Sequence, residues 1–214
     1  MNKQLAATAL ISLLVLSPSA AARERAPITV RDVTFKRTSS SWITADVEFQ
    51  AGDFATSATA RKKDYLERVK LTLTAAYEDR DLANSRKATS EQKKNPYEIY
   101  QRSVELTAVR RAKIITVRFF IPPAVVESKG FAEKPVGWML GWEVEGVEMP
   151  VDVERFPDNF SKKLQDRKVF ETFKKFIAEG ASSNEGIMLP PYHGPSGLQP
   201  KNDNKDFAFV RKDP

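Results

Sequence analysis

Hydrophobic side chains recur at every second position through most of the chain between residues 28 and 154. Successive side chains of an extended strand point to opposite faces, so this period predicts strands with one buried and one solvated face. The clearest case is the segment 69–77, where Val69, Leu71, Leu73, Ala75 and Tyr77 alternate with Lys70, Thr72 and Thr74. The same pattern predicts strands over 43–49, 104–108, 115–121, 136–144 and 147–153, and a weaker strand over 28–35.

Interruptions of this pattern indicate where the strands bend, turn or end. The phase of the first strand slips near Arg31-Asp32, and the parity flips at Glu145-Gly146, as a tight hairpin or a glycine bulge would cause. The strand over 115–121 ends at Pro122-Pro123. Pro150 has no N–H to donate to a ladder, so the strand over 147–153 is predicted at a sheet edge.

The number and spacing of these strands predict a mainly β protein. No helix-length apolar stripe separates them, as a parallel α/β fold would require, and one solvated face on each strand favours antiparallel sheets. We therefore predict an immunoglobulin-like two-sheet antiparallel sandwich, alike in architecture only, because the chain lacks the cysteine pair of antibody domains. Two insertions, residues 51–67 and 79–96, are expected to be surface loops or short helices.

The period of the hydrophobic pattern changes after the strands. Spacings of three and four predict an amphipathic helix over 162–179 that is stopped by Gly180 and docks its phenylalanine face on the sandwich; its apolar face holds Val169, Phe170, Phe173, Phe176 and Ile177. The tail, residues 181–214, is rich in proline and glycine and is predicted to be extended. Its apolar stretches, 187–189 and 207–210, are candidates for an added edge strand or for docking on a partner.

The N-terminus has the pattern of a secretory signal peptide over residues 1–22. Lys3 is followed by an apolar run from Leu5 to Leu16 and by the small residues Ala20-Ala21-Ala22. The run is shorter than the roughly 20 residues that span a bilayer, so no stable membrane span is expected. We predict a protein secreted to the periplasm or cell surface of a bacterium, with an immunoglobulin-like sandwich and C-terminal helix over residues 23–180.

The amino-acid composition excludes several kinds of functional site. The chain has no cysteine, which excludes a disulfide scaffold, a thiolate metal site, a lipoprotein anchor and a cysteine nucleophile. Its one histidine, His193, lies in the tail, and no G-x-S-x-G elbow accompanies it. The carboxylate pairs Glu143 with Glu145 and Asp152 with Glu154 are interpreted as solvated strand faces, and the oxygen-rich segment 202–206 lacks the pattern of a calcium loop. The sequence therefore predicts no catalytic residues, no metal and no cofactor, and the protein is not expected to be an enzyme.

The aromatic residues divide into core and candidate surface positions. Trp138 and Trp142 share a strand face with Leu140 and Val144, which favours core packing. Trp42 precedes a strand and is less committed to the core. The candidate ligand-contact aromatics are Trp42, Tyr97 and Tyr100.

Charge suggests the kind of surface that the protein could meet. The chain has 34 basic and 28 acidic residues and a formal net charge of +6. Many basic residues occur as doublets, and acidic residues lie between them, so a solvated surface is the first interpretation. An anionic glycan surface is a candidate partner, whereas nucleic acid is not expected for an exported chain without a basic and aromatic motif.

Four stretches together resemble a known group of proteins: the leader, SSSWITADVEF (39–49), PVGWMLGWEVEGVEMPVDV (135–153) and FKKFIAEG (173–180). They are similar to small secreted immunoglobulin-like proteins of type IV pilus gene clusters in mucin-dwelling verrucomicrobial gut bacteria. The resemblance implies a sandwich related to accessory domains of archaeal type IV pilus-like machines. It carries no catalytic or binding residues to this chain. The apolar run stops at Pro18, unlike that of a pilin, so an accessory, assembly or host-contact role is expected.

The leading hypothesis is a non-enzymatic secreted interaction or structural protein associated with type IV pili or the cell surface. Its expected partners are proteins of the pilus or envelope, or a second copy bound through an edge strand or the tail. The alternative is a carbohydrate-binding module that uses Trp42, Tyr97 and Tyr100. A weaker third hypothesis is a hydrolase of the glycoside type that uses Glu143 and Glu145.

Overall fold

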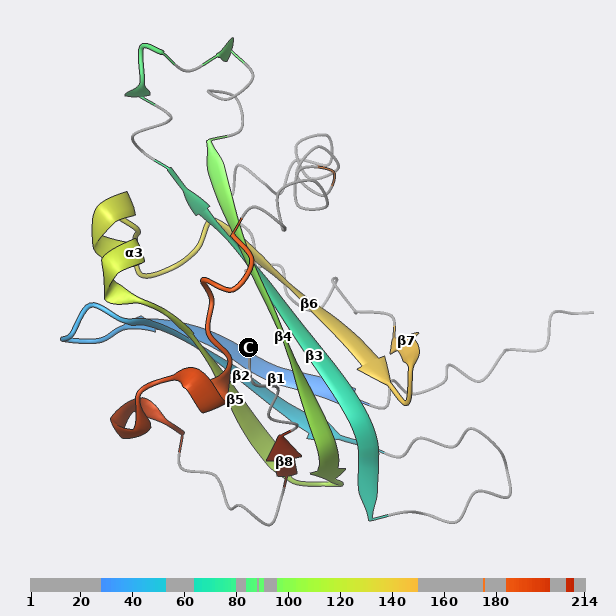
Figure 1. Cartoon of the computed structure of the whole chain (residues 1–214). Coiled ribbons are helices and arrows are strands. Elements are labelled where there is room, and N and C mark those ends of the chain that lie inside the picture. Colours follow the sequence, from blue (N-terminus) through green and yellow to red (C-terminus); the bar gives the residue numbers. More distant parts are fainter. Residues whose placement is uncertain are drawn as a thin grey trace, which may run out of the picture.

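Strands dominate the computed structural model, which describes residues 28–52, 64–79, 84–87, 89–90, 96–149, 175, 184–200 and 207–209. Figure 1 shows the arrangement of the elements. The strands are β1 (Ile28–Arg37), β2 (Ile43–Ala51), β3 (Tyr65–Glu78), β4 (Tyr97–Arg110), β5 (Ile114–Ile121), β6 (Gly137–Val144), β7 (Val147–Met149) and β8 (Phe207–Phe209). Between β5 and β6 lies one short helix, α3 (Pro123–Lys129), and two 3-10 helices, η4 (Pro191–His193) and η5 (Ser196–Leu198), follow β7 in the chain.

The described strands form two antiparallel sheets packed face to face. Sheet A has the order β1-β2-β5, and sheet B has the order β7-β6-β3-β4-β8. The chain therefore passes from sheet A to sheet B after β2, returns for β5, and leaves again for β6. If β1, β2, β3, β5, β6 and β7 are equated with strands A, B, C, E, F and G, this is the immunoglobulin order A-B-E and G-F-C. The predicted sandwich is confirmed.

Each strand predicted from the hydrophobic pattern is present within the described residues, and β3 and β4 extend furthest beyond their predicted bounds. β3 begins at Tyr65, but its first residues do not continue the predicted alternation, because Arg68 has φ 50° and Leu66 and Val69 on either side of residues 67–68 are both buried. β4 begins at Tyr97. Its first residues were not predicted, because Ile99 and Tyr100 are neighbours in sequence and are both buried, so the alternation is absent there. The first insertion is shorter than predicted, because β3 already begins at Tyr65, whereas the second keeps its predicted bounds of 79–96 between β3 and β4.

The two predicted irregularities of the sheets are confirmed. The ladder between β1 and β2 shifts between Val30 and Asp32. At the other site, Glu145 (φ 52°) and Gly146 (φ 86°) connect β6 to β7 as a two-residue loop. Positive φ at both central residues is the geometry of a type I′ turn, whose twist matches that of the flanking strands.

The helix α3 is not predicted by the sequence pattern. Pro123 occupies the first turn, where the missing N–H costs nothing, and Gly130 ends the helix in the left-handed region at φ 60°. Its one buried residue is Val126. The pair Pro122-Pro123 thus ends β5 and also begins a helix. The sequence pattern predicted the end of the strand but not the start of the helix.

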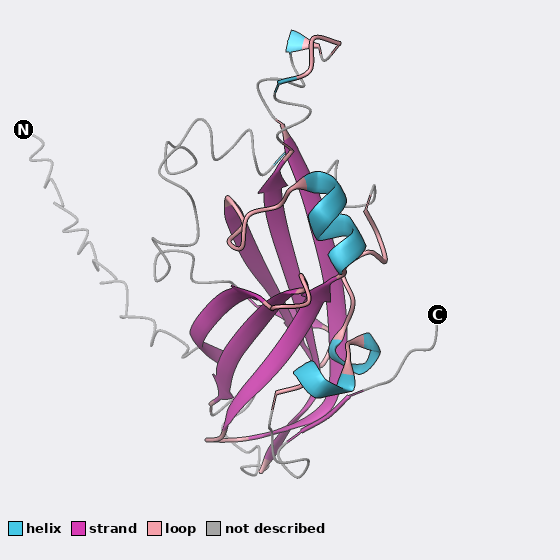
Figure 2. Ribbon diagram, turned by 90° about the vertical axis from the view of Figure 1, so that its left-hand side faces the viewer, coloured by secondary structure: helices cyan, strands magenta, loops and turns pink. Residues whose placement is uncertain are grey.

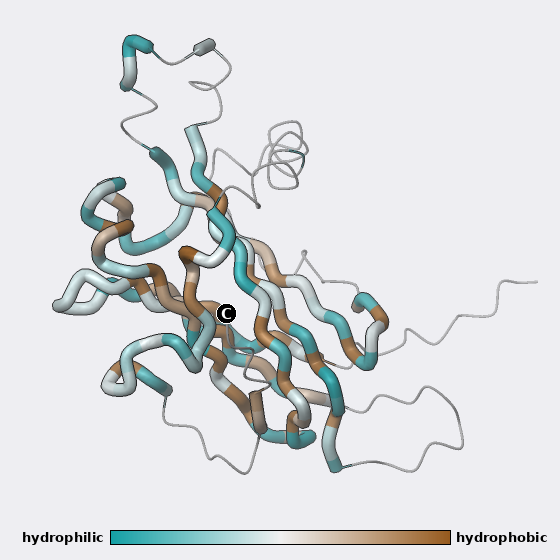
Figure 3. The backbone as a smooth tube through the Cα atoms, viewed as in Figure 1, coloured by the Kyte–Doolittle hydropathy of each residue, from teal (hydrophilic) through white to brown (hydrophobic). Residues whose placement is uncertain are grey.

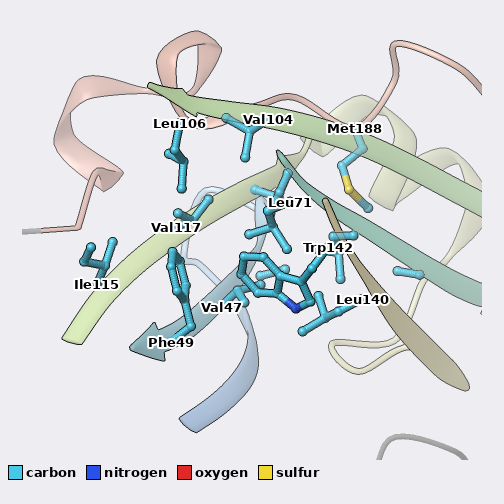
Figure 4. Close-up of a cluster of buried hydrophobic side chains, with 14 of the residues drawn as sticks. Val47, Phe49, Leu71, Val104, Leu106, Ile115, Val117, Leu140, Trp142 and Met188 are labelled. Atoms are coloured by element: carbon cyan, nitrogen blue, oxygen red, sulfur yellow. The ribbon is translucent and has the colours of Figure 1, made fainter. Parts of the chain in front are cut away.

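The hydrophobic core lies between the sheets (Figure 4). Val47, Phe49 and Val117 of sheet A meet Leu71 and Trp142 of sheet B, and the rings of Phe49 and Trp142 lie 4.8 Å apart. Trp138 packs against the core beside Phe35, so the predicted core role of both strand tryptophans is confirmed. Figure 3 shows hydrophobic and hydrophilic positions alternating along β3 and β4.

The described part of the tail lies on the edges of both sheets. Leu189 pairs antiparallel with Phe120 beside β5, and Met188 next to it is fully buried in the core. Further along, β8 pairs with β4 in sheet B. The prediction of an added edge strand in the tail is confirmed. Figures 1 and 2 show α3, η4 and η5 on one side of the sandwich.

Several predictions fall on residues outside the described ranges. The leader over 1–22 and the amphipathic helix over 162–179 are among them, apart from Lys175, and the division of the chain at residues 22 and 180 stays a prediction. Within the described ranges, no helix has the length and apolar character needed to cross a bilayer.

Candidate functional site

The outer face of sheet B carries a shallow groove of about 420 Å³. Strand alternation builds it: Leu71 and Leu73 of β3 enter the core, and their neighbours Lys70, Thr72 and Thr74 lie on the opposite face. β4 adds Gln101, β6 adds Met139 and Glu143, and β7 adds Glu148. The groove therefore crosses four adjacent strands, and polar side chains share its lining with apolar surface.

Three cross-strand pairs organise this surface. Lys70 Nζ lies 3.2 Å from Glu143 Oε2, and these two residues face each other in the β3–β6 ladder. The hydroxyls of Thr72 and Ser103 are 2.8 Å apart. Gln101 Nε2 donates to Thr74 Oγ1 at 2.8 Å. The exposed ion pair of Lys70 with Glu143 contributes only about 0–1 kcal/mol, so a ligand can take over its hydrogen bond at little cost.

The groove gives the predicted carboxylate pair different surroundings. Glu143 lies on β6 and is paired with Lys70, whereas Glu145 is exposed in the β6–β7 turn. The hydrolase hypothesis stays untested. Among the residues that the structure describes, no three histidine, aspartate or glutamate side chains are grouped so that they could hold a metal ion.

The three candidate ligand-contact aromatics are not brought together. Trp42 is half-buried at the start of β2, and its ring meets that of Phe120 edge-on at 6.1 Å. Tyr97 and Tyr100 belong to sheet B, and their exposed fractions are 7% and 0%. Only Trp42 of the three therefore presents part of a ring to solvent.

A second polar cluster, missed by the sequence analysis, ties α3 to β4. Lys129 of α3 forms an ion pair with Glu98, and its Nζ lies 3.5 Å from Asp79 Oδ2. The hydroxyl of Tyr100 donates to Glu98 Oε2 at 2.6 Å. The bond to Glu98 raises the pKa of Lys129. Burial, and next the bond to Glu98, raise the pKa of Tyr100. No sequence signal links residues 79, 98 and 129, because only the fold brings them together.

Tyr77 completes the interior side of this cluster. Its ring stacks on Phe131 at 4.6 Å with an interplanar angle of 20°. Its hydroxyl is buried and has no hydrogen-bond partner, and burial raises the pKa of Tyr77. The arrangement holds a helix on a sheet, which is a structural role.

Comparisons with known proteins leave the family open. No family model matches the chain, and no curated protein matches it. A crystal structure of a protein from Akkermansia muciniphila is similar to this chain, with a TM-score of 0.45 and 13% sequence identity. The similarity covers 75% of this chain and 93% of the other. The assignment of the sandwich rests on the strand order described above.

Proposed function

We propose that this protein is a non-enzymatic binding module of the bacterial cell surface or envelope that recognises a protein partner through the outer face of sheet B. The observation that carries the proposal is the groove across β7, β6, β3 and β4 with its three cross-strand polar pairs. The finer hypothesis, an accessory role with type IV pili, rests on the predicted leader and on the sequence resemblance.

The lining favours a protein over a saccharide. Met139 lies half-buried in the groove, so an apolar side chain stands beside the polar pairs. Protein interfaces combine such anchors with a polar rim and are enriched in methionine. Stacking of a sugar requires an exposed aromatic face, and Trp142, the one aromatic residue of the described lining, is 4% exposed.

Filling the groove tests the proposal. A Cβ at Gly141 would meet Thr72 Cβ at 3.5 Å, an ordinary contact, so Gly141→Arg can place a side chain in the groove without a steric clash in the sheet. Ile114→Arg, at a 60% exposed position of sheet A, is the matched control. Tagged full-length chains would be recovered from native envelopes after mild crosslinking. We expect the same partner with wild type and Ile114→Arg, and at least tenfold less of it with Gly141→Arg.

Other outcomes would contradict the proposal. Equal recovery of the partner by all three chains would exclude the groove as the binding site. Recovery of the wild-type chain without any crosslinked partner would exclude an envelope partner. Binding on a glycan array that is lost in Trp42→Ala would favour the carbohydrate-binding alternative. Hydrolysis of a glycoside that is lost when Glu143 and Glu145 are both changed to Gln would favour an enzyme.

A further inference from the structure

A proline-rich segment of the tail lies over the outer face of sheet A. This strap, defined here as residues 189–199, begins where Leu189 and Phe120 exchange two backbone hydrogen bonds of 2.8 and 3.0 Å. Phe119 and Phe120 are neighbours on β5, so they face opposite sides of the sheet. Phe119 belongs to the core between the sheets, yet Phe120 on the outer side is equally buried. The strap is what meets Phe120 there.

One position of the strap is shaped to the ring beneath it. A Cβ added to Gly194 would lie 2.0 Å from Phe120 Cε2, so no other residue fits without displacing the strap or the ring. Trp42, just before β2, meets the same Phe120 ring edge-on, with 6.1 Å between the ring centroids. Trp42 and Phe120 thus form an aromatic floor on which the glycine rests.

A cationic side chain holds the far end of the strap. Arg118 Nη1 donates to the carbonyl of Leu198, while its Nη2 donates to Asp46 Oδ2 at 2.5 Å. The carboxylate fixes the guanidinium in place, because Asp46 and Arg118 face each other in the β2–β5 ladder. Gln199 Nε2 donates to the carbonyls of Pro191 and Gly194, which folds the strap onto itself.

The backbone of the strap is suited to docking with little loss of entropy. Pro190 (φ −72°, ψ 167°), Gly194 (φ −77°, ψ 163°) and Pro195 (φ −58°, ψ 132°) are extended, and η4 and η5 lie between and after them. Proline-rich segments are already restricted to such conformations before they bind. Aromatic-lined grooves that receive them are a recurring mode of peptide recognition.

We propose that Trp42, Phe120 and Arg118 form a peptide groove that this chain fills with its own strap, and that the strap of a second copy can fill it in turn. Each contact is the same whichever copy supplies the strap. Residues 150–183 join β7 to the strap region, and a connection of that length reaches at most about 110 Å when extended. The covalently attached strap acts as if present at roughly millimolar concentration, so exchange is expected where copies are crowded.

A labelled peptide of residues 186–200 tests the groove on the full-length chain by fluorescence anisotropy. Gly194→Ala in the chain displaces its own strap, so this chain should bind the peptide at least tenfold more tightly than wild type. A peptide carrying the same Gly194→Ala change should bind neither the wild-type chain nor the Gly194→Ala chain. Leu189→Pro, which removes the N–H donated to Phe120, is a second variant with a displaced strap, used if the first does not fold by circular dichroism. Absence of binding to a folded, strap-displaced chain would overturn the groove.

Exchange between copies has its own measurement. Sedimentation of the wild-type chain up to about 1 mM should show dimers, which Gly194→Ala abolishes and Ile114→Arg retains. A wild-type chain that stays monomeric over this range, or dimers unchanged by Gly194→Ala, would overturn the second copy as occupant. These results are independent of the proposed function, which concerns the opposite sheet.

Discussion

Tyr77 shows how a single buried group weighs on stability. Its hydroxyl is buried without a partner beside Phe131, and a buried donor left unsatisfied costs about 1–3 kcal/mol. Tyr100, 6.2 Å from it between ring centroids, differs in one respect, since its hydroxyl donates to Glu98. The hydroxyl of Tyr77 thus lowers the stability of the fold, whereas the hydroxyl of Tyr100 raises it.

The first prediction contrasts these two residues. Tyr77→Phe removes the unsatisfied hydroxyl and should stabilise the protein by about 1 kcal/mol, whereas Tyr100→Phe leaves a Glu98 oxygen without its donor and should destabilise by a similar amount. Urea unfolding of both variants measures the difference. A loss of stability in Tyr77→Phe would mean that its hydroxyl has a partner in solution.

The same cluster predicts alkaline sensitivity. The pKa of Tyr77 and of Tyr100 is raised in the folded state from 10.0, so above about pH 10 the unfolded chain loses these protons first and stability falls as pH rises. The pKa of Lys129 is also raised, from 10.5, so its ion-pair contribution is present below that value and is lost at higher pH. Urea unfolding between pH 8 and 11.5 should show this fall, and Tyr77→Phe should reduce its slope.

At the scale of elements, the β6–β7 hairpin carries a specific local strain. Glu145 adopts φ 52°, where a residue with a Cβ is disfavoured by roughly 1–2 kcal/mol, while asparagine tolerates this region better. Glu145→Asn should therefore raise stability by about 0.5–1 kcal/mol. Gly146→Val should lower it by more than 1 kcal/mol, because φ is 86° there. Thermal unfolding of the two variants checks the opposite signs.

The elements that the sequence predicted are those whose hydrophobic alternation is uninterrupted. β2, β5 and β6 follow from their period of two, and the turn at Glu145-Gly146 follows from the flip in parity. The first residues of β3 were hidden because the alternation breaks at Arg68, so that the buried residues Leu66 and Val69 lie three positions apart. α3 was hidden because it spans only Pro123–Lys129, too short for a helical period to appear.

The candidate sites were predictable only in part, for a similar reason. Alternation assigns Lys70, Thr72 and Thr74 to a solvated face, but their partners Glu143, Ser103 and Gln101 follow from ladder registers that local pattern does not encode. Likewise, Tyr97 and Tyr100 are candidate ligand-contact residues by sequence, whereas β4 extends through them and buries both. The floor for Gly194 required the tail to return to β5, a contact between distant segments.

At the scale of the whole molecule, the sandwich divides its edges into two kinds. On one side the edges are covered by the tail: Leu189 pairs with β5, and β8 pairs with β4. The other side is formed by β1 and β7, and β1 is interrupted by its bulge, where Asp32 accepts the N–H of Val33 at 2.9 Å. Bulges and self-satisfied amides prevent uncontrolled strand addition. Recognition is therefore expected at the outer face of sheet B rather than at these edges.

The pairing of Leu189 with β5 and of β8 with β4 has a consequence for biogenesis. Both strands are synthesised well before the segment that shields them, so a nascent chain exposes their unpaired amides and Phe120 until that segment arrives. This interval is when off-pathway association is most favourable. A premature stop between β7 and residue 184 would make it permanent, so loss of this terminal segment should reduce the yield of folded protein far more than its size suggests.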